Sequence, residues 1–197
     1  MTFVDPYFDP SVGDLRNLLG ARSPAELNRL EAQAVFANEL DLQDARIGRT
    51  NDLAELRRIH GHLFRGVYDW AGQLRTVDIR KNLPGAQFFL PVSFITRASA
   101  YVFGELGEAD NLKNLSLAGF AERLAYFYDQ LNYIHPFREG NGRAQRAFWS
   151  RVARDGGYTV DWNAVVGEEN DKASGLAADH GDRSLLVAMF ERIARQL

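Results

Sequence analysis

The sequence predicts an all-α protein of one domain, and three observations lead to that class. Apolar residues from Leu117 to Ile134 recur at spacings of three and four, which describes one continuous face of a helix. Other segments begin with helix-capping patterns, whereas only one short region has the composition of strands. The chain has 197 residues, of which 46% are hydrophobic and 25% charged. That length is enough for one well-filled core and short for two.

Two helices are expected in the first third of the chain. The first begins at Ser23, where a capping box has proline at the first helical position. Its expected buried face consists of Leu27, Leu30, Ala34 and either Val35 or Phe36. The second begins at Asp52. Its expected inner face consists of Leu53, Leu56, Ile59 and Leu63.

Residues 74–91 are the exception to the helical pattern. Residues 76–79 suit a short strand, residues 82–85 are turn formers, and residues 88–90 suit a return strand. A two-stranded hairpin is marginal alone, so it should lie on the helical body. Its edge could pair with an extended peptide. A flap that only covers the core is the alternative.

Helical patterns resume after the hairpin and continue to the end of the chain. The expected helices span residues 92–106, 117–134, 143–154, 163–179 and 184–197. The apolar face of the second of these consists of Leu117, Phe120, Leu124, Phe127, Leu131 and Ile134. This helix therefore delivers His135 at its end.

Composition and charge exclude several functions. The formal net charge is −3 and basic residues are interspersed with acidic ones, so we expect no direct nucleic-acid binding. The absence of cysteine excludes disulfides, a thiolate nucleophile and a cysteine-based zinc site. The first residues lack the pattern of a signal peptide, and no stretch approaches the roughly 18 to 20 apolar residues of a membrane span. We expect a cytoplasmic protein without a membrane partner.

A dense polar motif, HPFREGNGRAQR, occupies residues 135–146. Its proline disfavours the helical region for the residue before it, so the preceding helix should end at His135. Residues 140–142, Gly-Asn-Gly, permit positive φ angles and close backbone approach, and the next helix should begin near Arg143. A glycine-containing loop at a helix N-terminus directs free N–H groups at one point, which suits a phosphate.

The charged residues of the motif add chemistry to this anion site. Arg143 and Arg146 lie three residues apart and supply guanidinium donors on neighbouring helical faces. Glu139 would repel a phosphate unless a divalent cation lay between them, and Mg²⁺ favours such shared oxygen sites. His135, with an ordinary pKa of roughly 6.5, can accept a proton near neutral pH. The loop has no serine or cysteine nucleophile, so the attacking hydroxyl should belong to the substrate.

The motif resembles the signature of the Fic family (filamentation induced by cAMP), HPFx[DE]GNGRxxR, at every specified position. The resemblance extends to LRRIHGHLFRGVYDWAGQLRTVDIRK, FLPVSFI and GGYTVDW. It implies the Fic fold, an all-α bundle in which a central helix-loop-helix carries the active site beneath a β-hairpin flap. The single domain would span residues 1–197, with its core at about 50–197 and an N-terminal helical extension at about 1–49. Most members transfer AMP from ATP to a protein hydroxyl and release pyrophosphate.

The resemblance also implies a role for each motif residue. His135 would be the general base, Glu139 the Mg²⁺ ligand and Phe137 the inward-facing anchor of the loop. The implied anion hole consists of Gly140, Asn141 and Gly142. The implied contacts to the β- and γ-phosphates are Arg143 and Arg146, with Arg146 at the γ-phosphate.

Residues outside the motif complete the expected site. Lys81 and Phe89 lie on the flap, where the family clamps the nucleotide and the target. Asp179, in an expected interhelical turn, could border the adenine pocket. His60 and His62 lie two positions apart on a helix and face different ways, so we do not expect them to share a metal. The residues Trp70, Trp149 and Trp162 are expected in the core.

The resemblance suggests a target and a partner as well. Gly142 occupies the position at which the related Doc toxins, which resemble kinases, have lysine, and this favours nucleotidyl transfer. The motif wording and the compact length are similar to toxins of toxin–antitoxin pairs, which modify a tyrosine of DNA gyrase and topoisomerase IV. We expect the target protein to dock at flap residues 76–90.

Control of the enzyme is expected to come from another chain. The inhibitory motif [ST]xxxE[GN] of many members is missing from this sequence. A small antitoxin chain should therefore supply an inhibitory glutamate to Arg146. Three alternatives remain: a nucleotide-binding module without transferase activity, a donor such as UTP or CDP-choline, and an exported effector.

Overall fold

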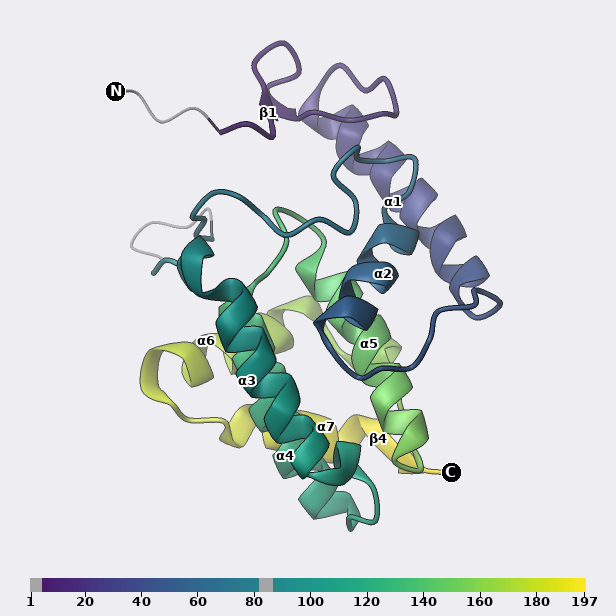
Figure 1. Ribbon diagram of the computed structural model, residues 1–197, viewed down its shortest axis with the longest axis vertical. Coiled ribbons are helices and arrows are strands. Elements are labelled where there is room, and N and C mark those ends of the chain that lie inside the picture. The colour runs from purple at the N-terminus through teal and green to yellow at the C-terminus, as the bar shows by residue number, and fades with distance from the viewer. Residues whose placement is uncertain (1–4, 82–86) are drawn as a thin grey trace.

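The computed structural model describes residues 5–81 and 87–197 and confirms the all-α class (Figure 1). The helices are α1 (Pro24–Leu42), α2 (Leu53–Leu63), α3 (Ile95–Glu108), α4 (Leu117–Ile134), α5 (Asn141–Asp155), α6 (Gly167–His180) and α7 (Ser184–Ile193). Short 3₁₀ turns occupy Val92–Phe94, Asp110–Leu112 and Trp162–Ala164. The strands β1 (Phe8–Asp9), β2 (Asp14–Leu15), β3 (Tyr158–Val160) and β4 (Ala194–Gln196) form two small antiparallel pairs, β1 with β2 and β3 with β4.

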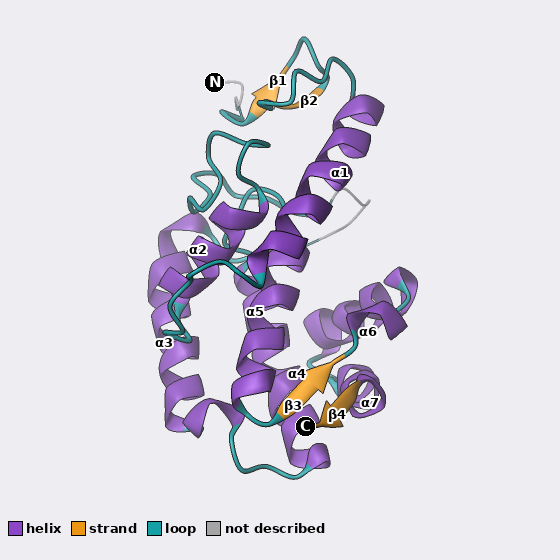
Figure 2. Cartoon of the chain, turned by 90° about the vertical axis from the view of Figure 1, so that its right-hand side faces the viewer, coloured by secondary structure: helices purple, strands orange, loops and turns teal. Residues whose placement is uncertain are grey.

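Helix α4 is the centre of the bundle. It contacts α3, α5, α6 and α7, and Figure 2 shows α3 and α5 upright, with α6 and α7 at a large angle to them. Of its expected apolar face, the side chains from Phe120 to Ile134 are buried, whereas Leu117 in the first turn is 39% exposed. The central helix of the sequence analysis is therefore the core helix of the fold. No helix in the described ranges is long and apolar enough to cross a membrane.

Helix α1 buries a narrower face than its sequence predicts. Leu27 and Val35 are buried and Phe36 is 63% exposed, so of the two expected alternatives Val35 is the core residue. The helix packs chiefly on α2, and the buried stripe includes a charged residue, Glu31. One contact partner can cover only one narrow side of a helix, which leaves Phe36 in solvent.

The flap segments lie antiparallel with little regular strand. Arg80 and Phe88 form an isolated antiparallel bridge, and the Phe89 N–H donates to the Ile79 carbonyl at 3.0 Å. The turn expected at residues 82–85 lies outside the described residues. The pairing direction thus agrees with the expected hairpin, although the ladder is shorter than expected.

The end of the chain departs from the expected helix over residues 184–197. Helix α7 stops at Ile193, and Ala194–Gln196 pair with Tyr158–Val160 instead. The Tyr-Thr-Val sequence of β3 favours a strand, and an unpaired strand edge is satisfied by this pairing. Helix α6 begins at Gly167 rather than residue 163, because a 3₁₀ turn capped by Asp161 precedes it.

Candidate active site

His135 ends helix α4 in a strained backbone conformation. Its φ is 46° and its ψ is 62°, the left-handed region that L-residues rarely adopt. Its N–H still donates to the Leu131 carbonyl at 3.1 Å, so the helix ends in a cap rather than fraying. A non-glycine residue in this region costs of order 1–3 kcal/mol and persists only where the surroundings enforce it.

The imidazole of His135 has one nitrogen free to accept a proton. Nδ1 lies 3.2 Å from the Asn132 carbonyl. Because a carbonyl only accepts, Nδ1 must carry the hydrogen, and Nε2 keeps its lone pair. Burial lowers the pKa of His135 to about 4. The ring of Phe89 stacks on the imidazole with centroids 3.7 Å apart, so the flap covers one face of the neutral ring.

The loop after His135 is closed by its own asparagine. Oδ1 of Asn141 accepts from the Phe137 N–H at 2.8 Å, and its Nδ2 donates to the Phe137 carbonyl at 2.8 Å. Phe137 is 1% exposed and stacks on His60. The Asn141 side chain, which the resemblance assigns to the anion hole, is thus used inside the loop. Of Asn141, this leaves the backbone N–H at the start of α5 for an anion.

The two glycines of the loop serve different purposes. Gly140 has a φ of 78°, and a Cβ there would lie 2.1 Å from the Phe64 ring. This position therefore requires glycine for both conformation and space. An added Cβ at Gly142 would meet no atom within 4 Å, so that position is open. Helix α5 starts here with no side-chain cap, which leaves the first N–H groups of its N-terminus for an anion.

The two motif arginines are in different electrostatic states. Arg143 lies between two carboxylates, Glu31 of α1 and Glu139 at 3.4 Å, and over the Phe64 ring at 4.7 Å. Among the described residues Arg146 has no carboxylate partner, and its Nε is buried without a hydrogen bond. Arg146 thus carries the uncompensated charge at the start of α5.

Glu139 presents an oxygen ligand at the mouth of the loop. Its side chain is 45% exposed, and its carboxylate accepts from the Gly140 N–H at 2.8 Å. The remaining oxygen capacity faces solvent and suits a hard cation such as Mg²⁺.

The expected residues outside the motif are less closely gathered. Lys81 on the flap pairs with Asp171 of α6 at 3.2 Å, which brings these two elements together. Asp179 is exposed further along α6, and no hydrogen bond links it to the motif among the described residues. Trp162 is only partly buried and lies 5.8 Å below the Arg146 guanidinium, whereas Trp70 and Trp149 are buried as expected. The core assignment of Trp162 was therefore incomplete.

Four polar residues that support the site were missed by the sequence analysis. They are Asp5, Glu31, His60 and Arg75. His60 accepts from the Gly72 N–H at 2.8 Å, so its Nε2 carries the hydrogen that it donates to the Glu139 carbonyl at 3.0 Å. His62 instead contacts the Asn38 carbonyl at 3.1 Å, so the two histidines point to different partners.

The N-terminal segment contacts the site directly. The Asp5 carboxylate accepts two hydrogen bonds from Arg138 of the motif, at 3.0 and 2.8 Å. The Thr76 N–H at the base of the flap donates to the Tyr7 hydroxyl at 3.0 Å. Residues 1–49 therefore include an integral part of the site, and their first described portion forms the β1–β2 pair rather than a helix.

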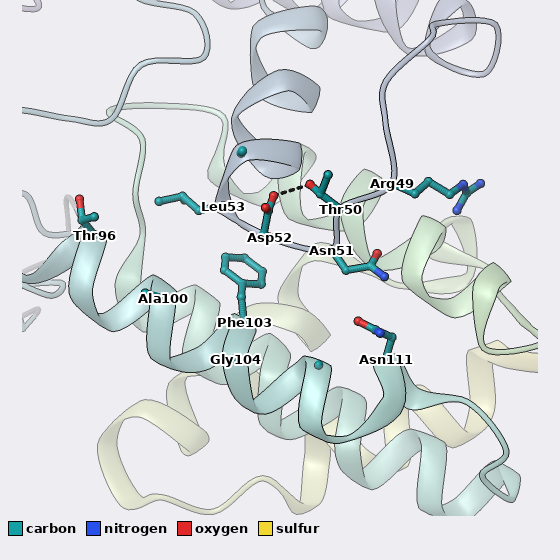
Figure 3. Close-up of a pocket in the computed structure, with 12 residues that line it drawn as sticks. Arg49, Thr50, Asn51, Asp52, Leu53, Thr96, Ala100, Phe103, Gly104 and Asn111 are labelled. Atoms are coloured by element: carbon teal, nitrogen blue, oxygen red, sulfur yellow. Dashed lines mark hydrogen bonds between the residues drawn. The ribbon is translucent and has the colours of Figure 1, made fainter.

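A cavity of about 660 Å³ lies away from this site, between the start of α2 and helix α3 (Figure 3). Asp52, Leu53 and Phe103 are among its lining residues, and none of the lining residues belongs to the motif. Asp52 is the N-cap of α2, where it accepts from the Glu55 N–H. The lining thus lacks the base and the anion donors that the motif supplies.

Comparison with known proteins agrees with this fold and motif. Residues 50–153 match the Fic/DOC family. The chain is 34% identical to the probable protein adenylyltransferase Fic of Escherichia coli over 193 residues, which cover 98% of this chain and 93% of that protein. It is 36% identical to the protein adenylyltransferase VbhT of Bartonella schoenbuchensis over 188 residues, which are 95% of this chain but 38% of that protein. The chain belongs to the Fic/DOC family.

Solved structures of the same fold hold nucleotides. BepC of Bartonella tribocorum, with bound AMPPNP, has a TM-score of 0.88 at 26% identity, covering 97% of both chains. A Fic domain of Bartonella quintana with bound ADP has a TM-score of 0.89 at 28% identity, covering 96% of this chain and 94% of that one. The fold is thus one that accommodates an adenine nucleotide.

Proposed function

We propose that the chain is a protein adenylyltransferase that transfers AMP from ATP to a hydroxyl group of a target protein. The observation that carries the proposal is the pairing of a neutral histidine, His135, with a helix N-terminus suited to an anion that begins six residues later, at Asn141. His135 has its Nε2 lone pair free, and α5 begins at Asn141 without a side-chain cap. Within the described ranges, Arg146 has no carboxylate partner and its buried Nε has no hydrogen bond. The relatives named protein adenylyltransferases, at 34–36% identity over most of this chain, support the same activity.

In the proposed mechanism His135 acts as the general base. Nε2 takes the proton of the target hydroxyl while the hydroxyl oxygen attacks the α-phosphorus of ATP. The bond from the α-phosphorus to the bridging oxygen breaks, and pyrophosphate leaves with that electron pair. The N–H groups at Gly142 and the Arg146 guanidinium hold the phosphates. Arg143 contributes less charge than the motif implies, because two carboxylates already neutralise it.

Glu139 would hold a Mg²⁺ ion together with the phosphate oxygens. Its half-exposed carboxylate supplies the oxygen donor that this cation prefers. When bound, the ion would offset the negative charge of the phosphates and allow Glu139 to lie beside them.

More specifically, we propose that the chain is a bacterial toxin that modifies a tyrosine hydroxyl of DNA gyrase or topoisomerase IV. The target protein would dock at flap residues 76–90. The absence of an [ST]xxxE[GN] motif supports control by a separate antitoxin chain whose glutamate pairs with Arg146. The unpaired state of Arg146 within the described residues suits that contact. One observation supports the alternative of an exported effector: the solved structures of similar fold from Bartonella are named VirB-translocated effector proteins.

Mass spectrometry of bacterial lysate proteins after incubation with the chain and Mg²⁺ tests the proposal. Separate reactions with ATP, UTP and CDP-choline identify the donor. We expect an added AMP on a small number of proteins with ATP alone, and no addition by the His135→Ala variant. Binding of ATP without transfer to any protein would contradict the proposal and support a nucleotide-binding module.

Growth measurements test the toxin hypothesis separately. Expression of the chain alone should slow bacterial growth, and co-expression of a neighbouring small open reading frame should restore it. Full transfer activity in vitro without toxicity would contradict the toxin assignment and favour an effector.

A further inference from the structure

Arg75 joins the flap to the catalytic end of helix α4. The residue is only 2% exposed although its side chain is charged. Nε donates to the His135 carbonyl at 2.8 Å, and Nη1 donates to the Val77 carbonyl at 2.8 Å. Nη2 donates to the Leu90 carbonyl and, at 3.4 Å, to the Ile134 carbonyl. One guanidinium therefore bonds both flap segments and the residue that bears the free imidazole nitrogen.

Backbone hydrogen bonds extend the same junction. The Arg75 N–H donates to the Pro136 carbonyl at 2.9 Å, and the Leu90 N–H donates to the Tyr133 carbonyl at 3.1 Å. The carbonyls of residues 133–136 are all bonded to flap residues as a result. Two of them, the carbonyls of Tyr133 and Ile134, belong to the last turn of α4, whose carbonyls have no partner within the helix.

The surroundings of Arg75 are unusual for a buried arginine. The nearest carboxylate is Asp78, 3.6 Å away and 55% exposed. The other acceptors are main-chain carbonyls, which carry no charge to neutralise the guanidinium. A charged group removed from water needs fixed, well-directed acceptors, and its loss leaves several carbonyls unsatisfied. Among the residues that Arg75 bonds, His135 is the one whose backbone has an unfavourable positive φ and must be held in place.

We infer that Arg75 is a positioning residue for the transfer reaction. It holds the His135 main chain in its left-handed conformation. The same guanidinium also fixes the position of the flap, whose Phe89 covers the imidazole. The inference rests on the proposed function, because positioning has meaning only if His135 is the base. Arg75 itself acts through His135 and the flap, because its side chain donates to main-chain carbonyls of the flap and of the end of α4.

The test compares Arg75→Gln and Arg75→Lys with a matched control, Arg151→Gln. Arg151 on α5 is also largely buried, and it donates to the Ile47 carbonyl at 2.7 Å and to Glu55 at 2.6 Å, away from the motif. The assay follows label transfer from ATP labelled at the α-phosphate to lysate proteins as the ATP concentration is varied. Thermal unfolding is measured for each variant.

A positioning role predicts a split between kcat and KM. Arg75→Gln should lower the maximal rate about 10²-fold, the loss typical of a misplaced reacting group. Its KM for ATP should stay within about threefold, because the phosphate donors lie on α5. Arg75→Lys should recover part of the rate, and Arg151→Gln should lower stability at an unchanged rate. A maximal rate of Arg75→Gln within about threefold of wild type, or an equal loss in Arg151→Gln, would overturn the inference.

Magnetic resonance of the free protein separates this inference from the proposed function. In wild type the His135 ring should give the signature of a single Nδ1–H tautomer, and Arg75→Gln should broaden it by exchange. If wild type transfers nothing, the proposed function fails while this readout still tests the junction. Should Arg75 variants not fold, the wild-type Arg75 Nε–H should exchange with solvent as slowly as the Leu90 amide. Faster exchange of Nε–H would contradict the junction.

Discussion

The motif loop at residues 135–146 and the flap at residues 74–91 meet at one histidine but are held in different ways. The loop is closed by Asn141, which bonds Phe137 within the same motif, and by His60 beneath it. The described flap residues share one isolated bridge, and their other contacts reach neighbouring elements: Phe89 stacks on His135, Lys81 pairs with Asp171, Thr76 bonds Tyr7, and Arg75 bonds the His135 carbonyl. The loop thus carries most of its own structural determinants, whereas the flap depends on contacts with other elements, several of which Arg75 makes at its base.

Replacement of His135 should produce the largest effect, because it removes the group that the loop and the flap share. His135→Ala should lower the transfer rate by roughly 10² to 10⁴-fold, as expected for loss of a general base. ATP affinity, measured by calorimetry, should be nearly unchanged. His135→Asn is a matched control, since asparagine tolerates a positive φ without supplying a base. Transfer at the wild-type rate in either variant would contradict the assignment of the base.

Substitutions at the two loop glycines should test how strictly the loop is determined. Gly140→Ala should lower the free energy of unfolding by about 2–4 kcal/mol, because the added methyl meets Phe64 at a strained φ. Gly142→Ala should change stability by much less, since its position is open, but should weaken ATP binding. Urea unfolding and calorimetry measure the two effects. Equal destabilisation by both variants would show that close approach to Phe64 is not the constraint.

Acid should weaken the loop through His60. Burial lowers the pKa of His60 to about 4, below the value of roughly 6.5 in the unfolded chain. The unfolded state therefore binds more protons between these values, and stability is lost as the pH falls through that range. His60 alone should cost about 1.5 kcal/mol between pH 6.5 and pH 5. Urea unfolding of wild type and His60→Gln should show a shallower pH dependence in the variant, and identical slopes would refute the assignment.

The smallest effect should come from the flap side of the imidazole. Phe89→Ala removes the stacked ring and exposes His135 to water, which should lower kcat/KM about tenfold at neutral pH. The wild-type kcat/KM should stay flat from pH 8 to pH 5, because burial holds the pKa of His135 near 4. In the variant the pKa should rise, so kcat/KM should begin to fall near pH 6. A wild-type profile that falls through pH 6.5 would contradict the buried neutral base.

The elements that the sequence predicted correctly are those with local signals. The apolar period of α4 and the capping box at Ser23 are contained in short windows, and the structure has helices in both places. The motif at residues 135–146 was likewise readable, because its glycines and proline act on the backbone next to them. The β3–β4 pairing was missed because it joins segments about 35 residues apart.

The roles of the polar residues that support the site could not be predicted from the sequence, for a different reason. Arg75, His60 and Glu31 act on partners distant in sequence, and the first two bond main-chain carbonyls, which carry no residue identity. A charged residue in a sequence is expected in solvent by default. Their only signal was charge or a histidine within a buried helix face, as at His60 beside Ile59.

The ion pair between Glu31 and Arg143 has a consequence for engineering a smaller enzyme. Helix α1, which supplies Glu31, precedes the residues 50–153 that match the family. A fragment trimmed to the matched region would retain every residue of the motif but would lose the Glu31 carboxylate that neutralises Arg143. Arg143 would then be held by Glu139 alone and could compete with a metal ion for that carboxylate. The smallest fragment that keeps this active site intact therefore includes helix α1, which contains no residue of the motif.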